Sequence, residues 1–439
     1  MRTFFIVWAG QLVSLAGTNL TAFGLSIFVY QKTGSVTLLA SVMLASQLPQ
    51  IAITPFAGAL VDRWDRRKAM ILSDAGAALG TIVMIGFYLT DMLEVWNIAI
   101  AVGIAGLFQA FQWPAYQAAM AVVVPRRHFG RASGLVQVAD AVGQLAGPIL
   151  AGFALAFGGI GAIFAIDVLS FLVAIGALLI VRFPSPGASA AGAEGAGSVW
   201  YETKYGFRYV FARHGLLALL VYFSVINLAF GFVGPLFVPF GLSLTSEVGL
   251  GTAFTTASIG VLLGSIVASA WGGPRRRVAG LLIGGGLLGV TFAAVGARPS
   301  IVWATAVLFV GMALIPTLNA TSQAIWLAKV EADLQGRVAA VRRVIAQGAI
   351  PVAYLLVGPL SDGVFEPLMA DNGALAGSLG KLIGTGPGRG LALFFAVIGA
   401  FVVVASALAW TYGPLRHLER DVPDAVEAAQ RGDTQPEPV

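Results

Sequence analysis

Residues 58–68 read Gly-Ala-Leu-Val-Asp-Arg-Trp-Asp-Arg-Arg-Lys, which puts four basic side chains between two long apolar segments. Each of these segments, at 37–60 and 69–90, is long enough to cross a bilayer as a helix, which takes about 20 largely apolar residues. Helices are expected because the lipid interior offers no hydrogen-bond partner to an open backbone. The ten other segments of this kind lie at 4–30, 96–121, 133–157, 160–182, 215–240, 250–271, 279–297, 301–326, 341–362 and 391–413. The sequence therefore predicts an all-α membrane protein with twelve transmembrane helices.

The composition supports a membrane protein and argues against other classes. Of the 439 residues, 58% are hydrophobic and 11% are charged, whereas a soluble protein has about 25% charged residues. The 55 glycines suit membrane helices, whose backbones approach each other closely at small residues. Membrane topology explains the net charge of +5, so we expect no nucleic-acid partner.

Motifs that carry catalytic or metal chemistry are missing from the sequence. There is no cysteine, which leaves no disulfide framework and no thiolate metal site. Neither a Gly-x-x-x-x-Gly-Lys-Ser/Thr phosphate loop nor a His-Glu-x-x-His zinc motif occurs. The three histidines, His128, His214 and His417, have no second ligand near them in the sequence. We therefore expect neither an enzyme, nor a cofactor, nor a metal site.

Basic residues indicate how the chain is oriented in the membrane. With both termini in the cytoplasm, 22 of the 26 lysines and arginines fall on the cytoplasmic side, where such residues accumulate in membrane proteins. The four exceptions are Lys32, Arg298, Lys381 and Arg389. The sequence thus predicts a multi-pass protein of the cytoplasmic (inner or plasma) membrane with both termini inside.

The spacing of the 58–68 stretch, Gly-x-x-x-Asp-Arg-x-x-Arg-Arg, resembles the loop between the second and third helices of the major facilitator superfamily. Asp65 stands where that family usually has glycine. The resemblance implies a secondary transporter with two pseudo-symmetric six-helix bundles, in which this loop latches the halves together at the cytoplasmic side. The residues expected to form the latch are Gly58, Asp62, Arg63, Arg66, Arg67, Asp74, Arg131 and Arg337.

Two contacts are expected within this latch. Asp62 should cap the helix after the loop, because an acid near a helix N-terminus is favourable. Arg66, Arg67 and Lys68 should pair with carboxylates such as Asp74. The alternative is a generic basic loop on the inner side of the membrane.

A stretch rich in proline, glycine and alanine divides the chain into two halves. Such small residues are typical of flexible linkers, and polar tails are typical of disorder. Gly130-Arg131 is echoed by Gly336-Arg337, which predicts two six-helix halves related by a parallel repeat. The expected organisation is an N-terminal bundle at 1–183, a cytoplasmic linker with an amphipathic helix at 184–214, a C-terminal bundle at 215–413 and a disordered cytoplasmic tail at 414–439.

A second motif lies in the segment 133–157. Residues 143–152 read Gly-Gln-Leu-Ala-Gly-Pro-Ile-Leu-Ala-Gly and resemble the antiporter motif of the superfamily, with Ala151 in place of one glycine. Gly143 and Gly147 share a helix face and allow close packing, and Pro148 removes a backbone hydrogen bond. Together with Gly152, these residues imply export of a substrate in exchange for protons; the alternative is a packing face without directional meaning.

Two acidic residues lie clearly within predicted spans, away from the span ends. Asp140 is about 13 Å along the helix from Arg131, and Asp167 lies in the segment 160–182. Ionisable groups inside a membrane are costly and usually functional, so both residues are candidates for proton coupling. A structural acid that is satisfied by hydrogen bonds is the alternative, with Ser170 as a local partner for Asp167.

Polar side chains recur along the first, fourth, seventh and tenth spans in chain order (4–30, 96–121, 215–240 and 301–326). In the superfamily, these four spans line the central cavity. Polar stripes on otherwise apolar helices should point inward, although hydrogen bonds between helices would explain them too. Span 1 lacks the acid that many relatives carry there, and span 4 lacks their arginine. The cavity residues predicted from these stripes are Gln11, Thr18, Asn19, Gln109, Gln112, Trp113, Tyr116, Asn227, Asn319 and Gln323.

Over residues 3–413 the chain resembles the macrolide-efflux branch of the superfamily, which includes siderophore exporters and drug:proton antiporters. The stretches that carry this resemblance are 11–14, 29–35, 62–68 and 384–390. It implies a monomeric exporter of a drug-like or secondary-metabolite molecule that works by alternating access, needs only the proton gradient and contacts the lipid bilayer. Two alternatives are a lipid or lysophospholipid flippase or uniporter on the same fold, and a membrane sensor or scaffold that does not transport.

Overall fold

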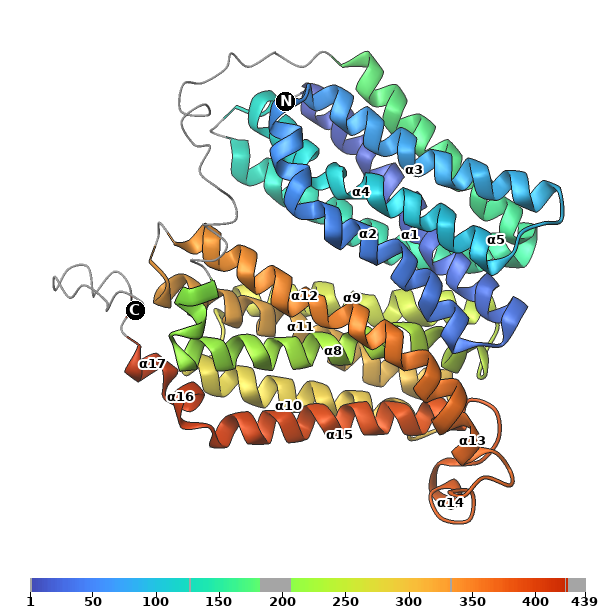
Figure 1. The fold of residues 1–439 in the computed structure, drawn as a ribbon, viewed down its shortest axis with the longest axis vertical. Coiled ribbons are helices and arrows are strands. Elements are labelled where there is room, and N and C mark those ends of the chain that lie inside the picture. The colour runs from blue at the N-terminus through green and yellow to red at the C-terminus, as the bar shows by residue number, and fades with distance from the viewer. Residues whose placement is uncertain (1, 126–127, 182–206, 332–333, 423, 425–439) are drawn as a thin grey trace. The chain divides into compact units, whose positions relative to one another are not determined.

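The computed structural model describes residues 2–125, 128–181, 207–331, 334–422 and 424, and these residues are helical apart from short connections (Figure 1). Eleven helices in this part of the chain are long and apolar enough to cross a membrane. They are α1 (Arg2–Thr33), α2 (Val36–Arg63), α3 (Arg66–Leu89), α4 (Val95–Val123), α5 (Phe129–Ile180), α8 (His214–Leu242), α9 (Glu247–Trp271), α10 (Arg277–Val295), α11 (Ile301–Lys329), α12 (Gln335–Leu360) and α15 (Arg389–Thr411).

The long helix α5 consists of two crossings. Its 52 residues are interrupted at Gly159, whose φ of 62° and ψ of −164° are not helical. The first part runs parallel to α1: Trp8 Nε1 donates to the Leu135 carbonyl at 2.6 Å, and Gly147 packs on Asn19. The second part runs antiparallel to α1, because Gly10 meets Ala177 whereas Gly24 meets Ile163. If α5 is counted as two crossings, the eleven helices correspond to twelve spans, which agrees with the number expected from the sequence.

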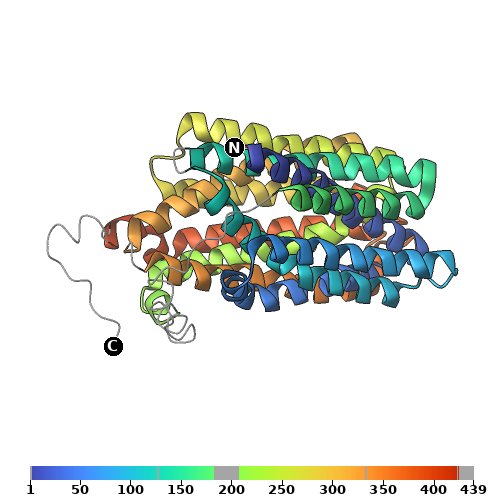
Figure 2. The same ribbon diagram turned by 90° about the horizontal axis from the view of Figure 1, so that it is seen from above.

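The chain forms two compact units. Unit 1 comprises 1–187, 235–258 and 354–364, and unit 2 comprises 188–234, 259–353 and 365–439. Unit 1 contains α1 to α5 together with parts of α8, α9 and α12. In unit 2, α10 and α15 run side by side (Figures 1 and 2), with Gly289 of α10 packed on the backbone of Gly399.

Asp65, and not Asp62, caps the helix that follows the 58–68 stretch. Asp65 is the N-cap of α3, and its Oδ1 accepts from the backbone N–H of Lys68 at 2.9 Å. Asp62 belongs to the last turn of α2, which ends at Arg63. The expected role of Asp62 is therefore wrong, and the residue that departs from the family pattern supplies the cap. The structure does not describe the surroundings of Gly58 or the side chains of Asp62, Arg63 and Arg337.

Arg67 joins the start of α3 to the end of α5. Its Nε donates to the Leu178 carbonyl at 2.7 Å, and an Nη donates to the Leu179 carbonyl at 2.6 Å. The last carbonyls of a helix have no partner within the helix, and a cation is favourable at that end. Arg67 thus stabilises unit 1 from within. Arg131, another expected latch residue, is exposed.

Replacing Arg67 by alanine is expected to lower the stability of the protein by about 1 kcal/mol, because two helix-end carbonyls lose a charged donor. The measurement is the unfolding temperature of the purified protein in detergent. Lys68→Ala is the matched control, since Lys68 is its exposed neighbour. Equal unfolding temperatures for the two variants would contradict this role of Arg67.

An acid from a distant part of the chain caps the start of α2. Asp362 lies in a short π-helix, Ser361–Phe365, that follows α12. Its carboxylate accepts from Ser35 Oγ at 2.8 Å, and from the backbone N–H groups of Val36 at 3.1 Å and Thr37 at 2.9 Å. Thr37 Oγ1 is a fourth donor, at 2.8 Å. A negative group at a helix N-terminus is favourable, so Asp362 stabilises the start of α2.

Asp362→Ala is expected to lower the unfolding temperature by a few degrees, because loss of an N-terminal cap costs about 1–2 kcal/mol. Asp371→Ala is a suitable comparison, since Asp371 is exposed on a neighbouring loop. Thermal unfolding of both purified variants in the same detergent is the measurement. If Asp362→Ala unfolds at the temperature of the Asp371 variant, the cap does not contribute to stability.

The expected linker and tail are described only in part. Residues 182–206, which include most of the linker at 184–214, lie outside the described residues, as do 425–439 of the tail. Residues 207–211 are helical. The tail is not disordered over α16 (Gly413–Arg416) and α17 (Leu418–Asp421), where Leu415 and Leu418 are buried.

Side chains of the C-terminal segment hold it to unit 2. The carboxylate of Glu419 accepts from the backbone N–H of Arg277 at 3.0 Å and caps α10. Lys329 donates to the Glu419 carbonyl at 2.8 Å and pairs with Asp424 at 2.8 Å. These contacts and the burial of Leu415 and Leu418 order the first part of the tail. The polar composition of the tail did not indicate them.

Candidate functional site

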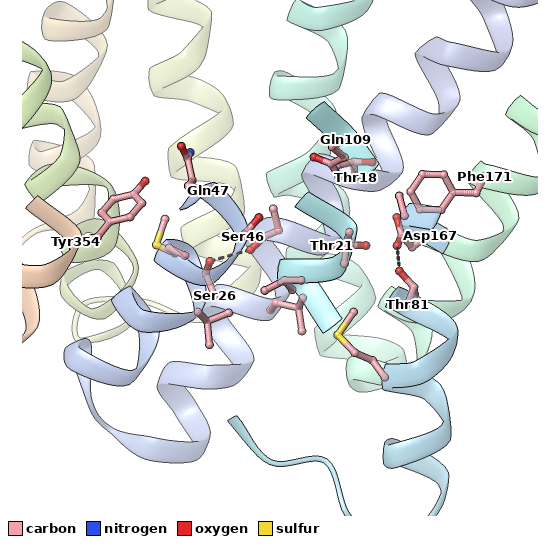
Figure 3. A pocket seen from close by; sticks show the side chains of 18 residues that line it. Thr18, Thr21, Ser26, Ser46, Gln47, Thr81, Gln109, Asp167, Phe171 and Tyr354 are labelled. Carbon is pink, nitrogen blue, oxygen red and sulfur yellow. Dashed lines mark hydrogen bonds between the residues drawn. The ribbon is translucent and has the colours of Figure 1, made fainter. Parts of the chain in front are cut away.

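Two cavities lie side by side within unit 1. The first, the Asp167 cavity, has a volume of about 200 Å³, and the second, the Asp74 cavity, about 190 Å³. Helices α1, α2, α3, α4 and α5 contribute to both, and Tyr354 of α12 adds to the first (Figure 3). The residues that line both cavities are Thr18, Ala77, Gln109 and Phe171.

Asp167 is the acid of the Asp167 cavity. Its side chain is 2% exposed, and Thr81 Oγ1 of α3 donates to its Oδ2 at 2.5 Å. Thr21 and Phe171 lie beside the carboxyl group (Figure 3). Ser170 was expected to satisfy this carboxyl, but its hydroxyl donates to the backbone carbonyl of Asp167 at 2.7 Å. The prediction of Ser170 as the partner of this carboxyl group is therefore wrong, because the partner, Thr81, belongs to another helix.

Asp74 is the buried acid of the Asp74 cavity, with 3% of the residue exposed. Gln11 Nε2 donates to its Oδ2 at 3.0 Å, and Gln112 Nε2 donates to its Oδ1 at 3.0 Å. Gln112 Nε2 also donates to Gln11 Oε1 at 2.5 Å. The expected pairing of Asp74 with the basic residues of the 58–68 stretch is therefore wrong. Asp74 lies about 12 Å along α3 from Arg66, too far into the helix for that contact.

Asp140 lines the Asp74 cavity and is partly buried. Tyr116 of α4 lines the same cavity. Gln137 and Gln144, the polar neighbours of Asp140 on its helix face, are exposed and do not line either cavity. The structure thus brings Asp140 near Asp74 and places Asp167 on the other side of the shared residues.

Most cavity candidates from the first and fourth spans line a cavity, but one of them packs against a neighbouring helix. Asn19 does not line either cavity: its Nδ2 donates to the Leu15 carbonyl at 2.8 Å, and its side chain packs on Gly143 and Gly147. One residue along a helix turns the side chain by about 100°, which separates Asn19 from Thr18. The candidates that do lie on the cavity walls are Gln11, Thr18, Gln109, Gln112, Trp113 and Tyr116.

The three candidates from spans 7 and 10 lie in unit 2. Asn319 lines a small cavity of about 20 Å³ beside Tyr222. Asn227 Nδ2 donates to the Phe223 carbonyl at 2.8 Å, and Gln323 Oε1 accepts from Arg342 at 3.2 Å. None of the three lines the Asp167 cavity or the Asp74 cavity.

The motif at 143–152 forms helix contacts. A Cβ on Gly147 would lie 2.9 Å from the backbone of Asn19, and one on Gly152 would lie 2.6 Å from the Glu247 carbonyl oxygen of α9. A Cβ on Gly251 of α9 would lie 2.3 Å from the Pro148 carbonyl oxygen. The motif thus brings α1, α5 and α9 together by backbone contact and does not line either cavity.

Two groups on the cavity walls had not been assigned to the cavity from the sequence. Asp74, Ala77 and Thr81 lie at i, i+3 and i+7 on α3 and face the cavities, so the helical period was available as a signal. On α2, Gln47, Gln50 and Thr54 repeat this spacing. Ser46 and Gln47 line the Asp167 cavity, and Gln50 lines the Asp74 cavity.

The walls of the two cavities combine acids with amides, hydroxyls and aromatic rings. Asp74, Asp140 and Asp167 are their carboxylic acids, and no lysine or arginine is among the described residues that line them. Such a surface suits a neutral or cationic organic molecule, because an anion would face uncompensated acids. The acids also provide places where a proton can bind.

Comparisons with known proteins agree with this architecture. The profile of the Major Facilitator Superfamily matches residues 7–354. Macrolide efflux protein A of Streptococcus pyogenes is 25% identical over 368 residues, which cover 82% of this chain and 90% of that protein. The multidrug efflux pump Tap of Mycolicibacterium fortuitum is 27% identical over 379 residues, 81% of this chain and 88% of that protein.

Solved transporter structures have a similar fold. The nucleoside transporter NupG has a TM-score of 0.71 at 10% identity, covering 94% of this chain and all of that chain (100%). A bacterial homolog of the human lysosomal transporter Spinster has a TM-score of 0.70 at 15% identity, covering 92% and 95% of the two chains. At these identities the likeness concerns the fold alone.

Proposed function

The chain belongs to the major facilitator superfamily, and from that premise we propose that it exports a drug-like or secondary-metabolite molecule in exchange for protons. It is a multi-pass membrane transporter and not an enzyme. Its relatives named for macrolide and multidrug efflux support the outward direction. The motif at 143–152, which resembles the antiporter motif, supports exchange.

The observation that carries the proposal is the pair of adjacent cavities in unit 1, with three acids and no basic residue on their described walls. Ionisable groups within membrane spans are costly and mark substrate or proton pathways. Aromatic and apolar residues such as Trp113 and Phe171 provide contact area for an organic cargo. The acids Asp140 and Asp167 remain the proton-coupling candidates from the sequence, and Asp74 joins them.

In the proposed cycle, the two halves alternate between states that open to opposite sides of the membrane. A proton that enters from outside and a cargo molecule that leaves the cell occupy the protein in different states. The free energy of the proton gradient then drives export without any cofactor. The 58–68 stretch would act as the cytoplasmic latch in this cycle, and a single chain would suffice.

The test uses the purified protein in proteoliposomes with a pH-sensitive dye inside. A panel of macrolides, siderophores and cationic dyes is added under a pH gradient, and protein-free liposomes serve as the control. Proton flux that depends on an added compound is expected, and the variants Asp74→Asn, Asp140→Asn and Asp167→Asn show which acid it needs. Transport of a compound without proton flux would overturn antiport, and transport of a labelled lysophospholipid alone would establish a flippase.

A further inference from the structure

Helix ends from distant parts of the chain meet within unit 1. Besides α1 to α5, this unit holds residues 235–258 and 354–364, which include the end of α8, the start of α9 and the end of α12. The topology predicted from the basic residues places these ends on the outer side of the membrane, together with the end of α1 and the start of α2. Segments from both halves of the sequence therefore close against each other on the outer side.

Hydrogen bonds join these ends across the two halves of the sequence. The Asp362 carboxylate, just beyond the end of α12, accepts four of them from the first residues of α2, at 2.8–3.1 Å. Gln31 Nε2, near the end of α1, donates to Glu247 Oε1 at the start of α9 at 2.6 Å. Gln31 and Thr37 are exposed, and Asp362 and Glu247 are partly buried. Water can therefore take the place of each partner when the helix ends separate.

Further inward, the helices pack through small residues and rings. A Cβ on Gly358 of α12 would lie 2.3 Å from the Cα of Thr37, so α2 and α12 touch backbone to backbone. The ring centroid of Phe254 in α9 lies 5.3 Å from that of Phe23 in α1 and 5.4 Å from that of Phe237 in α8. Surfaces of this kind can part without breaking a hydrogen bond inside a helix.

The two helices that Asp362 joins also line the Asp167 cavity. Tyr354 of α12 lies about 6 Å along the helix from Gly358 and lines this cavity (Figure 3). Val42 of α2 lies about 8 Å along its helix from Thr37 and lines the same cavity. Separation of α2 from α12 at the outer side would therefore expose the Asp167 cavity to the outside water.

Helix α2 has a cap of its own. Ser35 is its N-cap residue, and Ser35 Oγ accepts from the backbone N–H of Leu38 at 3.3 Å. The same hydroxyl donates its proton to Asp362, and one hydroxyl can do both. Asp362 adds a second cap from the π-helix Ser361–Phe365, an element that is rare and frequent at functional sites. The first turn of α2 therefore stays capped when the carboxylate withdraws, as a contact that opens repeatedly requires.

We propose that Asp362 and the first residues of α2, Ser35, Val36 and Thr37, form an outer clasp that holds the transporter closed to the outside and opens once in each transport cycle. The charge of Asp362 at the N-terminus of α2 favours the closed state. A group that stabilises one of two states shifts the balance between them. This inference rests on alternating access in the proposed function, and it holds for either direction of transport and with or without protons.

The sequence has no cysteine, so a single introduced thiol can report whether the clasp is open. Ser26→Cys is the reporter, because Ser26 lines the Asp167 cavity and lies about 10 Å along α1 from its outer end. A membrane-impermeant maleimide is added to right-side-out membrane vesicles without cargo or gradient. The labelling rate is divided by that of Met92→Cys, which is 60% exposed between α3 and α4.

Asp362→Asn is expected to raise the labelling rate of the reporter by about tenfold, since losing hydrogen bonds to a charged group changes an equilibrium by that order. Asp371→Asn is the matched control, because Asp371 is an exposed acid on the neighbouring loop, and it should leave the rate unchanged. A cap with a structural role alone would lower the unfolding temperature without exposing Ser26, because fraying of the first turn of α2 does not open the cavity.

Gly358→Ala opens the clasp by a different route. The added methyl group pushes on the backbone of Thr37 while Asp362 keeps its charge. Gly363→Ala is its control, since nothing lies within 4 Å of a Cβ built on Gly363. Faster labelling is expected for Gly358→Ala and not for Gly363→Ala, after size-exclusion chromatography has established that both variants are folded.

An unchanged labelling rate in folded Asp362→Asn would overturn the clasp, and if that variant does not fold, Gly358→Ala decides in the same way. The labelling needs no transported compound, so it is independent of the export proposal. Faster labelling in the clasp variants, with no compound of the proteoliposome panel transported by the wild type, would contradict export and leave the clasp standing.

Discussion

Replacing Gly106 by leucine is expected to leave little folded protein in the membrane. A Cβ on Gly106 of α4 would lie 2.1 Å from the backbone carbonyl oxygen of Ser46 in α2. That oxygen belongs to a helix backbone and cannot turn aside as a side chain would. Overpacking a close contact costs about 1–3 kcal/mol and occasionally more, and here two helices would have to separate along the Asp167 cavity, which Ser46 lines.

The measurement is size-exclusion chromatography of the detergent-solubilised variant, followed by its unfolding temperature. Gly86→Leu in α3 is the matched control, because nothing lies within 4 Å of a Cβ built on Gly86. We expect a single sharp peak for the control and aggregated or missing protein for Gly106→Leu. A sharp peak and an unchanged unfolding temperature for Gly106→Leu would show that α2 and α4 do not pack this closely.

Asp167→Ala is expected to reduce transport per folded molecule by about tenfold or more, since losing a contact to a charged group costs about 1.5–3 kcal/mol and 1.4 kcal/mol is a factor of ten. The change removes the one acid among the described residues that line the Asp167 cavity. It also leaves the Thr81 hydroxyl without its acceptor. Both exchange without a gradient and gradient-driven transport should fall.

Thr81→Val distinguishes a functional acid from a structural one. It removes the same hydrogen bond but keeps the carboxyl group of Asp167 in the cavity. We expect Thr81→Val to lower the unfolding temperature while retaining most of the transport. Initial rates in proteoliposomes, divided by the amount of folded protein, are the measurement. If Asp167→Ala transports at the wild-type rate by this measure, Asp167 serves stability alone.

Much of the architecture can be predicted from the sequence because it depends on local properties. A bilayer sets the length of an apolar helix, so the spans appear as apolar runs. The reversal within α5 falls at Gly159, between the predicted spans 133–157 and 160–182. The spacing of residues 58–68 identified the superfamily, and the sequence profile matches residues 7–354.

The details of the candidate site are less accessible to the sequence. Gln11, Thr18 and Gln112 were placed on inward faces by their helical period, and they line the cavities. Asn19 follows Thr18 directly but packs on Gly143 and Gly147. Polarity shows that a helix has an inward stripe; the neighbouring helix decides whether a side chain at its edge meets a cavity or a backbone.

Asp74 shows most clearly what depends on the tertiary structure. By sequence it follows a basic loop, and pairing with that loop was the nearest explanation. Its partners are Gln11, 63 residues before it, and Gln112, 38 residues after it. Similarly, Asp362 caps α2 from 325 residues away.

The sequence by itself determined the membrane class and the superfamily, because apolar length and short spacing are properties of neighbouring residues. Only the tertiary structure decided which acids are buried and what they bind. Burial and hydrogen bonding of a carboxyl group depend on helices that are distant in the chain and adjacent in space. In this transporter, the sequence singled out the loop around Asp62, whereas the structure shows that the buried acid Asp74 is bound by the amides of Gln11 and Gln112.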